Sequence, residues 1–588
     1  MNKTFKEHVP RSAHGYEGFP LDHIVNFTSV PGYLIPIAKQ ILDPGDKVKI
    51  STYLRTITQP LASPAMATII ERIEWFAVPI EQLYRPFATK YYGINDVDSD
   101  LLDTSYNNDQ LPAVKLDDLN YWMINRPLNF VTQASLPVTQ PTYSEAKRLC
   151  DALGYPASVG DATSGVNFLQ SVNALFPAAY QKIYYDHYRL TDREVNDPKA
   201  YNFDSIGLSN GTPFITNASP GYRLNKLYML RKRPYRRDYF TSLKVSPLMG
   251  NADVNAIGND LTALNQWLTG LTGASTAISG GGIVFSKGGA ILTNSNTTPS
   301  TVQMSGVSSS SNASITNAAD MARAVVSPAN IRSLFAIEKL LEVTRRAKKH
   351  YDMQTLAHFG VSVPKGLSGE CIKIGTHEQY IKINDVISTA TTSQGALGER
   401  AGIGASTGQS KTFHFEAKCH CILMGIYSAE PLMSYPQKGL DRLNSKVKAS
   451  EFYKPEYDSL GLQPVFGQEL MCYPIASGAQ HNMYNVVGWQ DRYSELKASF
   501  NRSFGGINTT FFKEWVCNRY VASPDEPLNK HFYEVWPSDM NEVFQVPYTG
   551  SVTSAVPEDV FEFDLLINQA YINIVKVSKK SIHGTPNL

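Results

Sequence analysis

The residues best suited to chemistry lie in a basic and aromatic stretch, GYRLNKLYMLRKRPYRRDYFTS, at 221–242. Cations bind the phosphates of nucleic acids and rings stack on the bases, so the stretch predicts a contact with single-stranded nucleic acid. A solvated surface and a seam of ion pairs between subunits are the alternatives. The candidate DNA-binding residues are Arg223, Lys226, Arg231, Lys232, Arg233, Tyr235, Arg236 and Arg237.

A second group with chemical potential is the Cys-x-Cys pair, Cys419 and Cys421, which flanks His420. Residues 411–428 alternate between apolar and polar side chains, as in a half-buried strand. In such a strand both cysteines lie on the apolar face and His420 points to the other face. No second ligand pair stands at zinc-finger spacing. We therefore expect structural cysteines, with no metal and no cofactor.

Motifs of catalysis are missing from the sequence. The glycine-rich stretch GALGERAGIGASTG at 395–408 has neither the G-K-[ST] ending of a P-loop nor the G-x-G-x-x-G pattern. The chain also lacks H-E-x-x-H and G-x-S-x-G, and shows no isolated Ser/His/Asp set or paired carboxylates. We expect that the protein is not an enzyme.

Several segments have the periodicity of regular elements. Alternating apolar residues predict strands at 48–54 and 73–77, the second ending at Pro79, and a final strand at 564–581. We expect helices at 144–153 and 176–189, the latter rich in tyrosine.

The most strongly marked helix starts at Ser327-Pro328, a pairing typical of helix N-termini. Ile331, Leu334, Ile337, Leu340 and Leu341 follow at helical spacing, which favours an amphipathic helix packed on a core. Basic residues gather at 345–349, where they oppose the helix dipole, and Gly360 permits a turn.

Composition indicates a soluble globular chain with many turns. The 588 residues carry 54 basic and 53 acidic side chains, so the chain is not a polycation that condenses nucleic acid by itself. Abundant Gly, Pro, Tyr and Phe favour short strands joined by long loops. Six scattered cysteines, no signal peptide and no long apolar run lead us to expect folding in a reducing cytoplasm.

Two segments are expected to lie outside the core. Residues 1–25 show little periodicity and predict a flexible arm. Residues 271–319 contain Gly, Ser, Thr and Asn at 29 of 49 positions, with one charge and one ring, and cannot build a dense core alone.

These segments, in order, resemble the major capsid protein of microviruses, the small tailless phages with single-stranded DNA, and most closely the gokushovirus-like branch. Leu462 stands where the family usually has Glu, so the chain is a divergent member. The matching residues span about half of the chain. They are IRSL at 331–334, Glu342, Tyr351, HFGV at 358–361, Gly32 to Pro36, Leu42, Pro44-Gly45-Asp46, Arg55, Pro64, Val78-Pro79, Phe87, Tyr188-Arg189, DYFTS at 238–242, Gln437, Gly439-Leu440, Phe452-Tyr453, Pro455, Leu460-Gly461, Gln463-Pro464, Gln490 and Arg492-Tyr493.

The resemblance implies a mainly β fold, a viral jelly roll (an antiparallel barrel of about eight strands) with long loop insertions containing helices. Residues 26–588 would form this single domain, with a variable surface insertion at 250–325. About sixty copies would close an icosahedral T=1 shell around single-stranded DNA. Implied partners are minor capsid or pilot proteins, small DNA-binding proteins and a host receptor, with assembly in the bacterial cytoplasm. The candidate host-contact residues are Phe285, Lys287, Asn294 and Asn296.

Two other functions fit a turn-rich β protein. One is a carbohydrate-binding β-sandwich, such as a phage spike or a lectin-like protein, and the other is a jelly-roll enzyme. The size of the purified protein separates them, since shells or pentamers favour a capsid and a sugar-binding monomer or trimer favours the second.

Overall fold

The computed structural model describes most of the chain. The described residues are 15–92, 111–124, 141–155, 171–204, 222–248, 283–285, 291–293, 328–347, 349–365, 368–387, 400–472, 485–509, 511–519, 521, 530–548 and 563–580. They divide into two compact units, one formed by 1–245 with 361–588 and one by 246–360. The described residues of the expected 250–325 insertion, 283–285 and 291–293, fall in the second unit.

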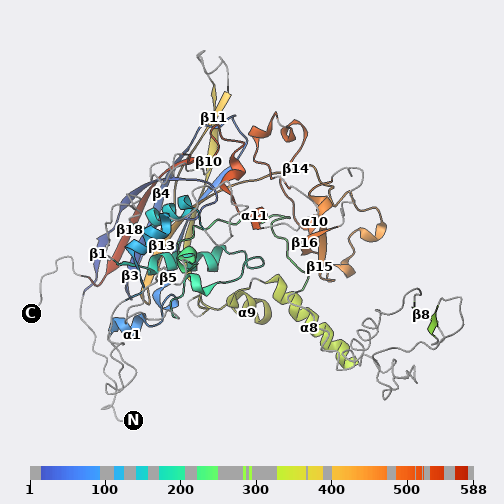
Figure 1. Ribbon diagram of the computed structural model, residues 1–588, viewed down its shortest axis with the longest axis horizontal. Helices are drawn as coiled ribbons and strands as arrows, with labels where there is room; N and C mark the ends of the chain where they lie inside the picture. Colours follow the sequence, from blue (N-terminus) through green and yellow to red (C-terminus); the bar gives the residue numbers. More distant parts are fainter. Residues whose placement is uncertain are drawn as a thin grey trace, which may run out of the picture. The chain divides into compact units, whose positions relative to one another are not determined.

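An antiparallel sheet of ten strands, counted over the described residues, forms the centre of the first unit (Figure 1). Its order is β1-β18-β4-β11-β10-β5-β13-β3, and β2 and β12 pair with β18 and β4. The strands are β1 (Glu17–Pro20), β2 (His23–Ser29), β3 (Ile35–Leu42), β4 (Lys47–Thr58), β5 (Ile69–Pro79), β10 (Ile372–Ile387), β11 (Arg400–Gln409), β12 (Phe413–Glu416), β13 (Cys421–Pro431) and β18 (Leu566–Ser578).

The mainly β jelly roll is confirmed. Eight longer strands form two four-stranded halves, β2-β18-β4-β11 and β10-β5-β13-β3, which β10 and β11 join. The short strands β1 and β12 raise the total to ten. β4, β5 and β18 match the strands expected from alternation. Because β1 and β2 pair with β18, residues 17–29 belong to the sheet, which differs from the loose arm expected up to residue 25.

The expected strand at 411–428 is wrong as one element. β12 pairs with β4 in the first half of the sheet, whereas β13 pairs with β5 and β3 in the second half. The chain bends between them at 417–420. β12 alternates between partly buried and exposed side chains, whereas every residue of β13 is buried, so the alternation in the sequence does not show where the chain changes its partner.

The two halves pack face to face around a core with a polar centre. The ring of Phe27 on β2 lies 5.0 Å from that of Tyr427 on β13. The fully buried carboxylate of Glu71 accepts hydrogen bonds from the Tyr427 hydroxyl at 2.7 Å and the Ser406 hydroxyl at 2.5 Å. The Gln379 amide donates a third bond to Glu71 at 3.0 Å. These bonds tie four strands of both halves together.

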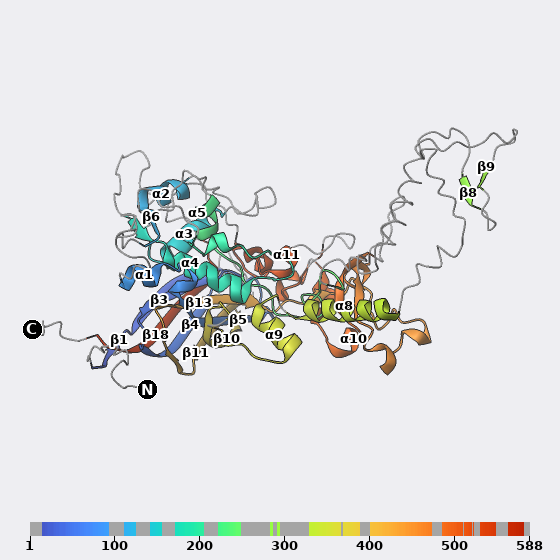
Figure 2. The same cartoon turned by 90° about the horizontal axis from the view of Figure 1, so that it is seen from below.

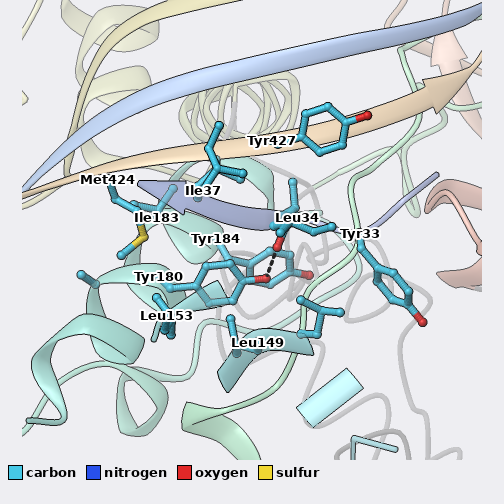
Figure 3. Packing of buried hydrophobic residues seen from close by; sticks show 14 of the residues in the cluster. Tyr33, Leu34, Ile37, Leu149, Leu153, Tyr180, Ile183, Tyr184, Met424 and Tyr427 are labelled. Atoms are coloured by element: carbon cyan, nitrogen blue, oxygen red, sulfur yellow. Dashed lines mark hydrogen bonds between the residues drawn. The ribbon is translucent and has the colours of Figure 1, made fainter. Parts of the chain in front are cut away.

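Helices cover one side of the jelly roll (Figure 2). Figure 3 shows the packing beneath them, where the Tyr180 hydroxyl donates to the Leu34 carbonyl at 2.9 Å. A capping box at Thr142 and Glu145 begins the expected helix near 144, and the tyrosine-rich helix is confirmed with a π-helical end at Tyr184–Tyr188. The helices are α1 (Phe87–Tyr92), α2 (Leu116–Ile124), α3 (Tyr143–Ala152), α4 (Leu175–Ile183) and α5 (Tyr222–Leu227).

Smaller elements complete the first unit. β6 pairs with β7, β15 with β16, and β14 runs parallel to β17. Among the described residues, no helix is long and apolar enough to cross a bilayer. The bounds are β6 (Ala113–Lys115), β7 (Ser171–Asn173), β14 (Tyr435–Pro436), β15 (Leu462–Phe466), β16 (Val486–Asp491), β17 (Arg502–Ser503), α10 (Ser494–Lys497) and α11 (Lys530–Tyr533).

The second unit holds the helix expected from Ser327. It is confirmed as α8 (Pro328–Arg346), followed by α9 (Tyr351–Phe359), which ends at Gly360 with φ of 70°. Ile337 and Leu340 of the expected apolar stripe are 37% and 54% exposed, so the expected packing of this stripe on a core is not found among the described residues. β8 (Ile283–Phe285) and β9 (Ile291–Thr293) pair within the same chain.

Candidate nucleic-acid interface

The basic stretch begins on α5 and continues as an extended segment that is fastened on both sides. Bridges join Lys232 to Tyr33 and Pro234 to Glu534. Asp238 ends the segment in a turn, since its carboxylate accepts from the backbone N–H groups of Phe240 and Thr241 at 2.9 and 2.7 Å. This placement buries most of the side chains that the sequence offers for DNA.

Arg231 is 6% exposed, and its guanidinium binds to partners inside the protein. Its guanidinium donates to the Gln181 amide oxygen at 2.7 Å and to the Tyr185 hydroxyl at 3.0 Å. It also forms an ion pair with Glu194 at 3.4 Å. Burial alone would lower the pKa of Arg231, but the neighbouring tyrosines and Glu194 raise it, so the charge is retained.

Arg233 lies in a second buried cluster around Glu74. Its guanidinium donates to Glu74 at 2.7 Å and to the Ser428 hydroxyl at 2.9 Å. Lys373 and the Tyr188 hydroxyl also donate to Glu74, each at 2.5 Å. Burial would raise the pKa of Glu74, but Arg233 and Lys373 outweigh it and lower the pKa to about 2. The cluster is therefore an ionised, internally neutralised network.

Four other candidates also have partners within the protein. Lys232 donates to Glu145 at 2.9 Å and lies 4.3 Å from the Trp536 ring. Lys226 forms an ion pair with Asp197, Arg223 donates to the Asn202 carbonyl at 3.1 Å, and the Tyr235 hydroxyl donates to Asp539 at 2.5 Å. These contacts fit the ion-pair alternative, although within one subunit.

Arg236 and Arg237 are the candidates with exposed side chains. The backbone N–H of Arg236 donates to Glu430, which fixes this part of the segment. The rings beside the two arginines are not available for stacking, because Tyr235 and Tyr239 are 8% and 3% exposed. The structure thus brings together two accessible cations at this place.

The buried partners were not identified from the sequence. Glu74 and Glu145 stand more than seventy residues before the basic stretch, and Glu194 and Glu430 lie on either side of it. One signal was available, since Glu71 and Glu74 interrupt the apolar strand IIERIEWFAVP, whose residues are all buried. A buried acid predicts a buried cation or a set of donors.

The Cys-x-Cys pair lies beside an aromatic cluster. The two sulfur atoms are 3.5 Å apart, and His420 lies 4.5 Å from the Tyr91 ring. The hydrogen bond from Cys421 lowers the pKa of Cys419 to about 7, and it raises that of Cys421. Within the described ranges, no three His, Cys, Asp or Glu side chains are placed to hold a metal ion. All six cysteines are free thiols.

The host-contact candidates belong to the second unit. Phe285 ends β8, where only the backbone is described. Lys287, Asn294 and Asn296 lie outside the described residues.

Comparison with known proteins gives three findings. The family model for the capsid protein (F protein) of phages matches residues 124–566. Capsid protein VP1 of Bdellovibrio phage phiMH2K is 24% identical over 526 residues, which are 85% of this chain and 84% of that protein. Capsid protein VP1 of Chlamydia phage 1 is 27% identical over 173 residues, which cover 29% of each chain.

Proposed function

Because the chain belongs to the phage capsid protein (F protein) family, we propose that its copies assemble into an icosahedral shell around a single-stranded DNA genome. The protein is a major capsid protein and its place is the virion. The family match over 124–566, on a chain that folds as a jelly roll, is the observation that carries this proposal. The simplest closed shell has about sixty copies.

The buried ion networks support a structural role for the basic stretch. Arg231, Arg233 and Lys232 connect the outer side of the sheet to α3, α4 and the segment around Glu534. Such contacts fix the geometry of a subunit that must repeat identically in a shell. Membership of a structural protein family supports a role that is not enzymatic.

Further partners follow from the same proposal. Arg236 and Arg237 contact the packaged DNA as exposed cations. Minor capsid or pilot proteins and small DNA-binding proteins assist packaging in the cytoplasm of the bacterial host. The 250–325 insertion, with Phe285, Lys287, Asn294 and Asn296, meets a host receptor.

The experiment is co-expression of the full chain with the minor proteins of its phage, followed by sedimentation and nuclease treatment. We expect fast-sedimenting particles that protect single-stranded DNA. A protein that stays monomeric or trimeric under these conditions and binds sugars would overturn the proposal in favour of a carbohydrate-binding spike.

A second comparison tests the role of the two arginines. R236Q/R237Q should fold normally and weaken binding of single-stranded DNA by the full chain. The slope of the logarithm of the binding constant against the logarithm of the salt concentration should fall in magnitude by about 1.4. An unchanged slope would show that these arginines do not contact DNA.

A further inference from the structure

One half of the jelly roll has a bare outer face. Every residue of β5 and β13 is buried, because these strands have covering structure on one side and the core on the other. β4 and β18 instead alternate between buried and exposed residues along their length. In Figure 2 helices α1 to α5 lie on one side of the jelly roll, and β18, β4 and β11 lie on the opposite side.

Strand register aligns a row of exposed apolar side chains on this face. Ile24 on β2 stands opposite Tyr571 on β18, which stands opposite Tyr53 on β4. Their exposed fractions are 55%, 40% and 40%. Directly opposite residues have Cβ atoms about 4.5–5.5 Å apart, so the two tyrosines project from adjacent positions of the sheet. Within the described part of the chain, neither tyrosine hydroxyl has a hydrogen-bond partner.

Cations surround this row. The outward positions of β4 and β18 carry three charged side chains, Lys47, Lys49 and Arg55, and all three are positive. None of them forms an ion pair with a described residue, and the nearest acid in the register is Glu416, opposite Lys47 at the end of the sheet. The centre of the face is therefore positive.

A hollow adjoins the row. Its volume is about 810 Å³, within the range of small-molecule pockets, and most of its surface is apolar. Arg55, Ile57, Ile567 and Gln569 contribute one wall from the same strands. Residues of β3 and α3, among them Ile35 and Asp151, contribute another wall, so the hollow lies at the edge of the face and not at its positive centre. Arg55 stands opposite Gln569 in the register, next to the paired tyrosines. A base that leaves its stack next to the tyrosines has a cavity to enter.

We propose that this bare face, here called the tyrosine ladder (Ile24, Lys49, Tyr53, Arg55 and Tyr571), binds single-stranded DNA. Bases stack on the two tyrosines, Arg55 and Lys49 hold phosphates, and the hollow accepts an unstacked base. The inference rests on the proposed function, because the packaged genome supplies the ligand.

Charge favours DNA over a second protein copy as the occupant. A contact between copies that excludes water would bury the charges of Arg55 and Lys49 away from any acid on this face. Burial of unpaired charges costs free energy unless the partner copy supplies carboxylates to pair with them. A polyanion supplies one negative charge for each nucleotide along its length. The tyrosine ladder also offers exposed rings beside its cations, which the surroundings of Arg236 and Arg237 do not.

The test measures binding of a fluorescent oligo(dT) 20-mer to the full-length protein over a range of salt concentrations. Y53A/Y571A should weaken binding by at least tenfold, because the stacking of bases on two rings is lost. K49Q/R55Q should lower the log–log salt slope by about 1.4. Y121A on α2, an exposed tyrosine on the helix-covered side, is the matched control and should bind as the wild type does.

Ultraviolet cross-linking of wild-type particles gives a second measurement that needs no variant to fold. DNA should cross-link to peptides containing Tyr53 and Tyr571. DNA-filled particles whose cross-links fall elsewhere would overturn the tyrosine ladder and leave the proposed function intact, whereas DNA-free particles would contradict both. Unchanged DNA binding by Y53A/Y571A, together with weaker self-association, would identify the face as a contact between copies and also overturn the inference.

Discussion

Replacing Glu74 by Gln should destabilise the subunit strongly and in a pH-dependent way. The Glu74 side chain is 4% exposed and forms ion pairs with Arg233 at 2.7 Å and Lys373 at 2.5 Å. In E74Q the buried Arg233 keeps its hydrogen bond to Ser428, but among the described residues its remaining ion-pair partner is the more distant Glu430, 3.6 Å away. Breaking a buried pair from one side typically costs about 3–5 kcal/mol, because the remaining charge stays desolvated.

The pKa of Glu74 gives a second estimate of the free energy that its ionised carboxylate contributes to folding. It falls from 4.5 to about 2 on folding, and each unit corresponds to about 1.4 kcal/mol, so ionisation contributes about 3 kcal/mol. Because the folded-state pKa is depressed, this contribution is fully present above pH 4.5. It is lost as the pH falls from 4.5 towards 2, so the deficit of E74Q should shrink over the same interval.

The assay is urea unfolding of the unassembled subunit, followed by tryptophan fluorescence at pH 7, 5 and 3. D458N is the control, since it removes the exposed Lys497–Asp458 pair and should cost less than about 1 kcal/mol. If E74Q matches D458N at pH 7, or if its deficit at pH 3 equals that at pH 7, the reasoning about the Glu74 cluster is refuted.

Two further predictions use the same subunit or its particles. G32A should lower the unfolding temperature much more than G45A, although both glycines have positive φ, of 101° and 93°. A Cβ at Gly32 would lie 2.3 Å from the Val535 carbonyl oxygen, whereas a Cβ at Gly45 would lie 3.4 Å from its nearest atom. Equal shifts of the unfolding temperature in a thermal melt would show that the structure around Gly32 adjusts to the added Cβ without cost. Deleting residues 272–317 and joining the ends by a short Gly/Ser link should leave assembly intact, because the entropy of loop closure changes slowly with loop length. Adsorption of the particles to host cells should fall, because the proposed receptor contact is removed. Normal adsorption would exclude the receptor role, and failed assembly seen by electron microscopy would show that the segment contributes to an interface between subunits.

Local pattern predicted the elements that depend on local physics. Alternation located β4, β5 and β18, and Ser327-Pro328 located the start of α8. The same alternation misled at 417–420, since a strand's pattern does not reveal its partner and β12 and β13 belong to different halves of the sheet.

Features that depend on distant contacts could not be predicted. The sequence of the basic stretch favours a surface that binds DNA, but in the structure its cations pair with Glu74, Glu145 and Glu194, which are distant in the sequence. The tyrosine ladder could not be predicted from the sequence, because its residues come together only in the folded sheet. Tyr53 and Tyr571 are more than five hundred residues apart, and only the register of β4 and β18 makes them neighbours.

The mass of the purified particle tests the central claim most directly. A shell of about sixty copies of this 65.1 kDa chain has a protein mass of about 3.9 MDa, with encapsidated single-stranded DNA in addition. Native mass spectrometry or light scattering should give that value, and cryo-electron microscopy should show icosahedral symmetry. A particle of a few copies, or a larger one without closed symmetry, would contradict the account of this protein as the subunit of an icosahedral shell.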